Sequence, residues 1–318
     1  MESKKHSHKP ILSVITPTFN ESENILSLFE RMNKSLDSIG VDWEWLIVDD
    51  HSSDDTFEKI ETLAASSQNI KGVRLSSNSG THKAAFCGLE LCQGNCFVIL
   101  ASDLQDPPEL IPDLFEEWKN GSQIIWAARK SREGESLSKT TASKCYYWLM
   151  ECFVGIPNSS PLGADFFMLD RRVRDALNMY GETNISILSL ISKLGFRQKT
   201  IFYKKKKRLY GRSGWTLEKK FKLLLDSVIA FTFKPIRYMS FLGFLIAFSG
   251  FVYAIFVLFN ALSGNPTEGW SSMMITTLII GGTQMIMLGV LGEYLWRTLD
   301  EARNRPRFHI ESDFGLKD

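Results

Sequence analysis

The sequence predicts an α/β domain built on a mainly parallel sheet, followed by two membrane-spanning helices. Short apolar runs typical of buried strands alternate with segments of helical periodicity, at 12–17, 44–50, 71–76, 96–102 and 123–129. Apolar strands separated by helices are typical of parallel sheets covered on both faces. No charged residue occurs from Tyr238 to Thr267 or from Gly269 to Gly292, and such stretches predict helices that cross a bilayer.

The first predicted helix carries one apolar face. Its apolar residues recur with the three- and four-residue spacing of a helix that packs on a sheet: Ile25, Leu28, Phe29, Met32 and Leu36. Asn20 and Glu23, which precede this run, resemble a helix N-cap and its capping-box partner. The helix is therefore expected to begin directly after the first strand.

Charge and cysteine content exclude some classes of protein. The 318 residues include 37 Lys and Arg against 36 Asp and Glu, a formal net charge of +1, so no nucleic-acid binding is expected. The five cysteines lack the paired CxxC spacing of a zinc site, which favours buried thiols in a reducing cytosol: Cys87, Cys92, Cys96, Cys145 and Cys152.

The predicted layout has five parts. They are a disordered N-terminus at 1–10, an α/β domain at 11–203, a basic loop with an amphipathic juxtamembrane helix at 204–235, a transmembrane hairpin at 236–298, and a cytoplasmic tail at 299–318. The loop at 263–270 contains no Lys or Arg, whereas arginines flank the hairpin, so the positive-inside rule places both chain ends in the cytoplasm. Residues 217–233 indicate a helix lying on the bilayer surface, with a core-packing helix as the alternative.

Polar segments follow four of the predicted strands, at 17–21, 49–56, 76–80 and 102–106. The carboxyl ends of parallel strands meet at one edge of a sheet, where ligands bind. Turn formation is an alternative role for Asp residues near prolines, and helix capping is an alternative for Asp49, Asp50 and Asp54. Four polar strand ends on one rim favour a binding site.

Four motifs in order resemble a known family. They are VITPTFNESENI, LIVDDHSSDDT, SNSGTHKAAFCGLE and ASDLQDPPELI, and they resemble family 2 glycosyltransferases with the nucleotide-sugar-binding GT-A fold, in particular the polyprenyl-phosphate branch that includes dolichyl-phosphate-mannose synthase-like and bactoprenol glucosyltransferase-like enzymes. The resemblance runs from Ile11 to about Pro306. It implies a multi-pass enzyme of the inner membrane whose cytoplasmic catalytic domain moves one hexose from a nucleotide-sugar, UDP-sugar favoured, to polyprenyl phosphate with inversion.

The resemblance also implies a metal site for Mg²⁺ or Mn²⁺. Asp103 matches the metal-bridging carboxylate of the family and Gln105 matches a supporting ligand. The usual motif is D-x-D-x-Q, and Ala101 stands at its first Asp, so Asp106 or water would complete the shell. Ordinary turn chemistry is the alternative role for these residues.

Donor and catalytic residues follow from the same resemblance. The implied donor-binding residues are Pro17, Asn20, Glu21, Asp50, Asn78 and Gly80. Asp50 would accept a hydrogen bond from a ring N–H of uracil or guanine. Asp165 matches an aspartate beside the sugar, although Phe167 stands where relatives commonly have Arg. Because a phosphate acceptor is already anionic, Asp165 is expected to orient substrate rather than to abstract a proton; a strand-end turn is the alternative.

The acceptor phosphate is assigned to a basic region. RLYGRSGW resembles the family's R-x-x-G-x-S/T-K-W loop, with Gly214 in place of the usual Lys. The residues implied for the acceptor phosphate are Arg129, Arg132, Arg208, Arg212 and Ser213. The run Lys204–Lys207 is equally consistent with a solvated face or with attraction to anionic lipids.

Two other functions are considered. A processive polysaccharide synthase would bring a Q-x-x-R-W motif and more spanning helices than this sequence has. A non-catalytic nucleotide-sugar-binding scaffold of a glycan-assembly complex would be consistent with the departures at Ala101, Phe167 and Gly214. Small residues in the second apolar helix would also permit a homo-oligomer through close helix packing: Gly281, Gly282, Gly289 and Gly292.

Overall fold

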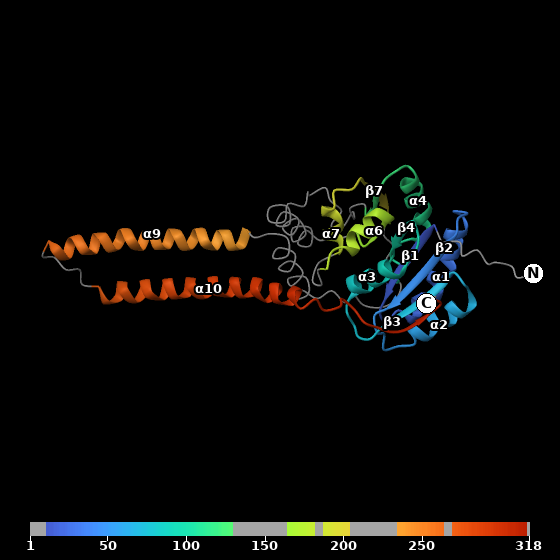
Figure 1. Cartoon of the computed structure of the whole chain (residues 1–318), viewed down its shortest axis with the longest axis horizontal. Helices are drawn as coiled ribbons and strands as arrows, with labels where there is room; N and C mark the ends of the chain where they lie inside the picture. The colour runs from blue at the N-terminus through green and yellow to red at the C-terminus, as the bar shows by residue number, and fades with distance from the viewer. Residues whose placement is uncertain (1–10, 130–163, 182–186, 204–233, 264–268, 317–318) are drawn as a thin grey trace, which may run out of the picture. The chain divides into compact units, whose positions relative to one another are not determined.

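A computed structural model describes residues 11–129, 164–181, 187–203, 234–263 and 269–316 (Figure 1). The chain divides into two compact units. The first consists of Met1–Lys222 together with Pro306–Asp318, and the second is Leu223–Arg305. The predicted juxtamembrane helix at 217–233 lies outside the described residues.

The first unit is built on an eight-stranded sheet with the order β7-β5-β6-β4-β1-β2-β3-β8. The strands are β1 Leu12–Thr18, β2 Trp43–Asp49, β3 Ile70–Leu75, β4 Cys96–Ile99, β5 Ile124–Arg129, β6 Phe166–Asp170, β7 Gln198–Tyr203 and β8 Ile310–Phe314. β1 is parallel to β2 and β4, β2 is parallel to β3, and β5 is parallel to β7. β6 and β8 are antiparallel to their neighbours. The predicted mainly parallel sheet is confirmed.

Helices cover the sheet in an order that follows from strand order. α1 Ser22–Asp37 and α2 Thr56–Ser66 connect β1 to β2 and β2 to β3 in one direction. The chain then reverses from β3 to β4 through α3 Thr81–Leu91, and right-handed crossovers put α3 on the opposite face. The remaining helices of this unit are the 3₁₀ turn η1 Pro108–Leu110, α4 Ile111–Lys119, α6 Arg171–Asn178 and α7 Ile187–Lys193. α4 packs beside α1, and α6 packs beside α3.

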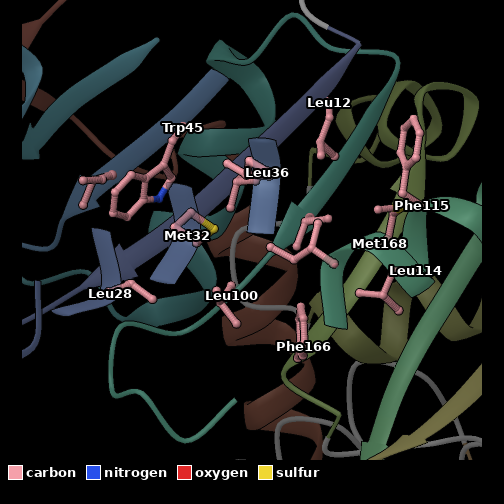
Figure 2. Packing of buried hydrophobic residues seen from close by; sticks show 14 of the residues in the cluster. Leu12, Leu28, Met32, Leu36, Trp45, Leu100, Leu114, Phe115, Phe166 and Met168 are labelled. Atoms are coloured by element: carbon pink, nitrogen blue, oxygen red, sulfur yellow. The ribbon is translucent and has the colours of Figure 1, made fainter. Parts of the chain in front are cut away.

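The core beneath α1 confirms the predicted apolar face. Ile25, Leu28, Met32 and Leu36 are fully buried in one cluster with strand residues such as Trp45 (Figure 2). Phe29 packs at the edge of this cluster and stacks on Trp45, with ring centroids 6.3 Å apart. Truncating one such Leu to Ala costs about 2–5 kcal/mol in other proteins, so this face fixes where α1 sits.

The predicted capping box of α1 is wrong. The residue at the N-cap is Glu21, and its side chain makes no capping hydrogen bond. The Oδ1 atom of Asn20 instead accepts a hydrogen bond from the backbone N–H of Ser53, 2.8 Å away. Asn20 therefore joins two loops rather than starting a helix.

The second unit contains two long apolar helices, α9 Lys234–Leu262 and α10 Trp270–Ala302, which lie side by side (Figure 1). The segments Ile236–Asn260 and Ser272–Ala302 are long and apolar enough to cross a membrane, with mean hydropathies of 2.4 and 1.8. Their large apolar side chains are exposed, as Phe251 and Phe259 show at 66% and 69%. A core helix of a water-soluble protein would bury such side chains, so the exposure favours lipid as their surroundings.

The end of the chain returns to the sheet. We predicted only a tail at 299–318, whereas residues 310–314 form the edge strand β8 against β3. The segment IESDF is short and two of its five residues are charged, so it carries no apolar run that would identify a strand. Its pairing partner lies more than 200 residues earlier in the chain, and only the fold brings the two together.

Candidate active site

Four loops meet where the parallel strands end, and each contains a residue with positive φ. These residues follow β1, β2, β3 and β4 in turn: Asn20 (54°), His51 (62°), Gly80 (92°) and Leu104 (57°). Three of the four non-glycine residues with positive φ in the described ranges lie at this rim. Such conformations cost energy and cluster at functional sites. The rim predicted from the polar strand ends therefore also carries the backbone strain of the sheet unit.

The loop after β4 presents Asp103 and Gln105 on one side. Ser102, Leu104 and Asp106 are buried, whereas Asp103 and Gln105 between them are partly exposed. Leu104 is 2% exposed and anchors the loop in the core with its left-handed backbone. The backbone N–H of Gln105 donates to Oδ1 of Asp103 over 3.1 Å. Both oxygen-bearing side chains consequently face outward from the same segment.

The residues on this loop fit a divalent cation shared with a diphosphate. They offer one carboxylate and one amide oxygen, and Mg²⁺ accepts such a set when phosphate oxygens and water supply the remaining ligands. Among the described residues, no group of three or more His, Cys, Asp and Glu side chains forms a preformed metal cage. The loop would therefore hold a cation together with its substrate rather than alone.

Asp106 was expected as a possible further metal ligand, but its carboxylate points into the core. It is 1% exposed, and its Oδ1 accepts a hydrogen bond from the hydroxyl of Tyr203. Tyr203 ends β7 and packs edge-on against Phe166, with ring centroids 6.2 Å apart. The pair ties the loop that carries Asp103 to the strand whose chain continues into Lys204–Lys207.

Asp50 connects two of the rim loops. It is 4% exposed; its Oδ1 accepts from the N–H of Ser79 over 2.7 Å, and its Oδ2 accepts from the N–H of Gly80 over 2.8 Å. Burial raises the pKa of the Asp50 carboxyl, and these two N–H groups act in the opposite direction. These bonds reach the loop before α3, so Asp50 does not cap α2. A carboxylate has about four acceptor positions, so two remain for a ligand N–H.

Asp49 and Ser52 hold the loop after β2. Asp49 is fully buried, and its carboxylate accepts from the N–H and the hydroxyl of Ser52. Burial raises the pKa of Asp49, and the Ser52 hydrogen bonds oppose the shift. The hydroxyl oxygen of Ser52 also accepts from the N–H of Asn20 over 2.9 Å. The loops after β1 and β2 are therefore fixed to each other by both Asn20 and Ser52.

The helix-capping alternative applies to Asp54. Its Oδ1 accepts from the N–H of Thr56, the first residue of α2, over 3.1 Å. Its Oδ2 lies 3.4 Å from the N–H of Ser22, the first residue of α1. Asp54 therefore joins the starts of two helices.

The other donor candidates have mixed surroundings. Pro17 is buried within β1, and its carbonyl accepts from the hydroxyl of Ser102. Glu21 accepts from the side-chain amide of Asn24 and donates its backbone N–H to Thr56. Asn78 is exposed on the loop before α3. Glu21 and Asn78 lie on rim loops and Pro17 near the end of β1, and of these three only Asn78 is exposed.

Asp165 reaches the rim through an antiparallel strand. It is exposed and directly precedes β6, which runs between β4 and β5 in the opposite direction. The start of β6 therefore lies at the edge where β4 and β5 end. Ile99 pairs with Phe167, and the same register carried two residues further places Asp165 opposite Ala101.

Phe167 is buried near the start of β6. Its side chain is 1% exposed and packs against Trp126 with ring centroids 5.3 Å apart. An aromatic pair therefore occupies the position at which the family resemblance led us to expect an Arg. Position 167 therefore contributes packing, and no charge, to this part of the site.

The acceptor candidates are only partly described. Arg129 is the last residue of β5 and pairs in register with Tyr203 at the end of β7. β7, rather than β5, is thus the outermost parallel strand at this side of the sheet. The remaining acceptor candidates lie outside the described residues: Arg132, Arg208, Arg212 and Ser213.

The structure adds three residues that no motif indicated. Tyr203 holds the loop after β4, and Arg74 and Glu311 contact the loop after β2. Each acts through a contact between distant segments, so local sequence patterns could not reveal it. Ser52 lies within the second motif, but its contact with Asn20 likewise comes only from the fold.

Known proteins resemble this chain in sequence and in fold. The family model described as Glycosyl transferase family 2 matches residues 13–173. The chain is 33% identical over 306 residues to the glycosyltransferase YkcC of Bacillus subtilis, which covers 96% of this chain and 94% of that one. It is 29% identical over 301 residues to the SfII prophage-derived bactoprenol glucosyl transferase of Shigella flexneri, which covers 94% and 97%.

A solved structure shares the architecture. Glucosyl-3-phosphoglycerate synthase from Mycobacterium tuberculosis matches with a TM-score of 0.50 at 15% identity, over 69% of this chain and 78% of that one. At this identity the likeness concerns the fold, which is the GT-A-like α/β arrangement. With this fold, the match to the family model over half of the chain and the relatives that match along nearly its whole length, the protein is a glycosyltransferase that belongs to glycosyl transferase family 2.

Proposed function

We propose that this protein transfers one hexose from a nucleotide-sugar, with UDP-sugar favoured, to polyprenyl phosphate at the cytoplasmic face of the inner membrane. The observation that carries the donor half is the rim of four loops, on which Asp103 and Gln105 face outward after β4 and Asp50 links the loops after β2 and β3. The acceptor half is supported by the two exposed apolar helices and by relatives named bactoprenol glucosyl transferases.

The roles of the residues follow from charge. When bound, a divalent cation neutralises the negative charge that builds on the leaving diphosphate. Asp103 and Gln105 would hold that cation, and Asp50 would accept a hydrogen bond from the base. The acceptor phosphate oxygen attacks the anomeric carbon as the bond to the diphosphate breaks, which inverts the configuration. Asp165, at the same rim, would orient the sugar or the acceptor, because the anionic acceptor needs no base.

Chain connectivity supports a hairpin topology. The chain leaves the sheet after β7 and rejoins it at β8, with α9 and α10 between these two strands. A single folded sheet lies on one side of a membrane, so two spanning helices would have to cross and return. The loop at 264–268 would then lie on the opposite side, as the absence of Lys and Arg near it also predicts.

One experiment tests the proposal. Membranes that contain the protein are incubated with a panel of radiolabelled nucleotide-sugars and undecaprenyl phosphate, and the lipid is extracted. We expect label in the lipid fraction with one donor and none when Asp103→Asn replaces the wild type. Absence of labelled lipid with every donor would favour the non-catalytic scaffold. The missing carboxylate at Ala101 would then be read as a sign of lost catalysis.

A further inference from the structure

β8, the strand that follows the two apolar helices, contains a β-bulge beside the rim of loops at the carboxyl ends of the parallel strands. β8 pairs with β3 so that Arg74 opposes Ser312, but the next pair is Leu75 with Ile310. Glu311 is therefore the extra residue of the bulge. Bulges re-aim a side chain and are frequent next to active sites.

Glu311 contacts two residues at the ends of neighbouring strands. Its Oε2 lies 3.2 Å from Nε of Arg74, on β3, and 3.3 Å from Nδ1 of His51, which follows β2. Nδ1 of His51 is also 3.1 Å from the carbonyl oxygen of Leu75. Because both neighbours of this nitrogen are oxygen acceptors, the proton of the imidazole is held on Nδ1.

Arg74 carries the effect of Glu311 into the loop after β2. Its Nη2 donates to the carbonyl oxygen of Ser52 over 3.1 Å, and its Nε lies 3.8 Å from the buried Asp49 carboxylate. The guanidinium also lies over the ring of Phe57, 5.1 Å from the centroid. Glu311 and Asp49 both approach Nε of Arg74 as charge partners without a hydrogen bond to it, and the hydrogen bond to Ser52 is made by Nη2.

The loop held in this way is the one that meets the donor-binding loop after β1. Ser52 accepts from the N–H of Asn20, and Asn20 accepts from the N–H of Ser53. His51 adopts its positive φ at the same bend. A chain of contacts therefore runs from Glu311 through Arg74 and Ser52 to Asn20.

We propose that Glu311 is a positioning residue for the donor: through Arg74 and His51 it holds the loop 49–53 in the conformation that receives the nucleotide. The inference rests on the proposed function, because it assumes that a nucleoside diphosphate binds at this rim. It makes the segment beyond the apolar helices part of the donor site. A protein cut before β8 would lose this support even with every motif of the first half intact.

The test compares two charge-neutral variants of one strand in the full-length protein in detergent. Glu311→Gln removes the charge that faces Arg74 and His51. Asp313→Asn makes the same change at an exposed residue two positions later, which pairs with Val73. UDP and GDP binding is measured by calorimetry with Mn²⁺ present. Steady-state kinetics give kcat and the KM values for donor and lipid. Hydrogen exchange of the backbone amides at 49–56 reports on the loop itself.

We expect Glu311→Gln to weaken binding of the nucleotide about three- to tenfold, a modest effect because the Glu311 side chain is 48% exposed. KM for the donor should rise by the same factor, while kcat and KM for the lipid stay constant. Exchange at 49–56 should quicken without any nucleotide. Asp313→Asn should match the wild type in every measurement, and Glu311→Asp should fall between the two because its shorter side chain reaches only one partner.

Two results would overturn the inference alone. One is equal nucleotide binding and equal loop exchange in Glu311→Gln and Asp313→Asn. The other is a loss of thermal stability in Glu311→Gln that lowers kcat and raises both KM values together, since that pattern indicates a general structural role. If the wild type bound neither UDP nor GDP, the proposed function would fail, and the inference would fail with it.

Discussion

The carboxylates at the rim fall into two groups, buried and exposed, and the two groups have different roles. Asp49, Asp50 and Asp106 are buried and accept hydrogen bonds from neighbouring loops, so they shape the rim. Asp103 and Asp165 remain open to solvent and can meet a substrate. Only the open carboxylates are candidates for contact with the donor phosphates or the sugar.

Replacement of Asp103 by Asn is the sharpest test of the metal loop. The change removes the only carboxylate that this loop presents outward, so a cation would lose its charged ligand. Because a bound metal supplies several kcal/mol of charge stabilisation, we expect transfer to fall by about a hundredfold or more and metal-dependent UDP binding to weaken. Radiolabel transfer to lipid and calorimetry provide the two measurements.

Glu116→Gln is the matched control, because Glu116 is exposed on α4 and away from the rim loops. Normal turnover by Asp103→Asn at ordinary Mg²⁺ or Mn²⁺ concentrations would contradict the metal assignment. The reverse change, Ala101→Asp, restores the first carboxylate of the family motif. We expect it to lower the metal concentration that gives half-maximal activity, and an unchanged or higher value would argue against a ligand at position 101.

Arg208 tests the acceptor site. Arginine–phosphate hydrogen bonds contribute roughly 1.5–3 kcal/mol each, so we expect Arg208→Ala to lower kcat/KM for polyprenyl phosphate by about ten- to a hundredfold. UDP binding should stay constant. Arg208→Lys should recover part of the loss, because Lys keeps the charge without the planar fork. A defect confined to nucleotide binding would move Arg208 to the donor site.

At the scale of elements, the end of β7 and the loop after β4 are joined by Tyr203 and Asp106. The loop presents Asp103 outward only while Leu104 and Asp106 remain inserted in the core. β7 leads into the basic segment that the acceptor is proposed to use. This hydrogen bond therefore connects the supports of both proposed substrate sites.

Tyr203→Phe removes the hydrogen bond to Asp106 and tests whether the loop after β4 depends on it. We expect the free energy of unfolding to fall by about 0.5–1.5 kcal/mol, because one buried hydrogen bond is lost. The metal concentration for half-maximal activity should rise as the loop loosens. Denaturant unfolding and a metal titration are the measurements, with Tyr180→Phe as the control, since Tyr180 is 40% exposed. Unchanged metal dependence together with reduced stability would limit the pair to a structural role.

At the scale of the whole molecule, the described part of the chain has two long apolar helices, α9 and α10, between strands β7 and β8 of one sheet. Asn265→Cys tests the resulting topology. We expect a membrane-impermeant maleimide to label this residue in intact cells, because the proposed topology would put position 265 on the outer side. Burial raises the pKa of Cys87 to about 12 and also raises the pKa of Cys92 and Cys96, so these three thiols add little background.

Ser38→Cys provides the control for the other side, because Ser38 is exposed on the sheet unit. It should be labelled only after the membrane is permeabilised. Labelling of Asn265→Cys solely after permeabilisation would overturn the hairpin topology.

The sequence alone determined the features that depend on local periodicity. Apolar runs located β1 to β5, helical spacing identified the buried face of α1, and stretches without charged residues identified both long apolar helices. Polar residues after each strand indicated the rim, because parallel strands end together. These predictions succeeded because the surroundings of an element leave a local pattern in its sequence. A strand covered on both faces is a continuous apolar run, a helix with one buried face has apolar residues spaced by three and four, and a helix that crosses a bilayer lacks charged residues.

Only the tertiary structure decided how distant segments combine. β6 inserts antiparallel between β4 and β5 and so brings Asp165 to the rim, and β8 returns from beyond the apolar helices to place Glu311 against Arg74. Tyr203 finds Asp106 across 97 residues of sequence. The partners in these contacts are set by sheet order and by packing, which depend on the whole chain, so no short stretch of sequence contains the information.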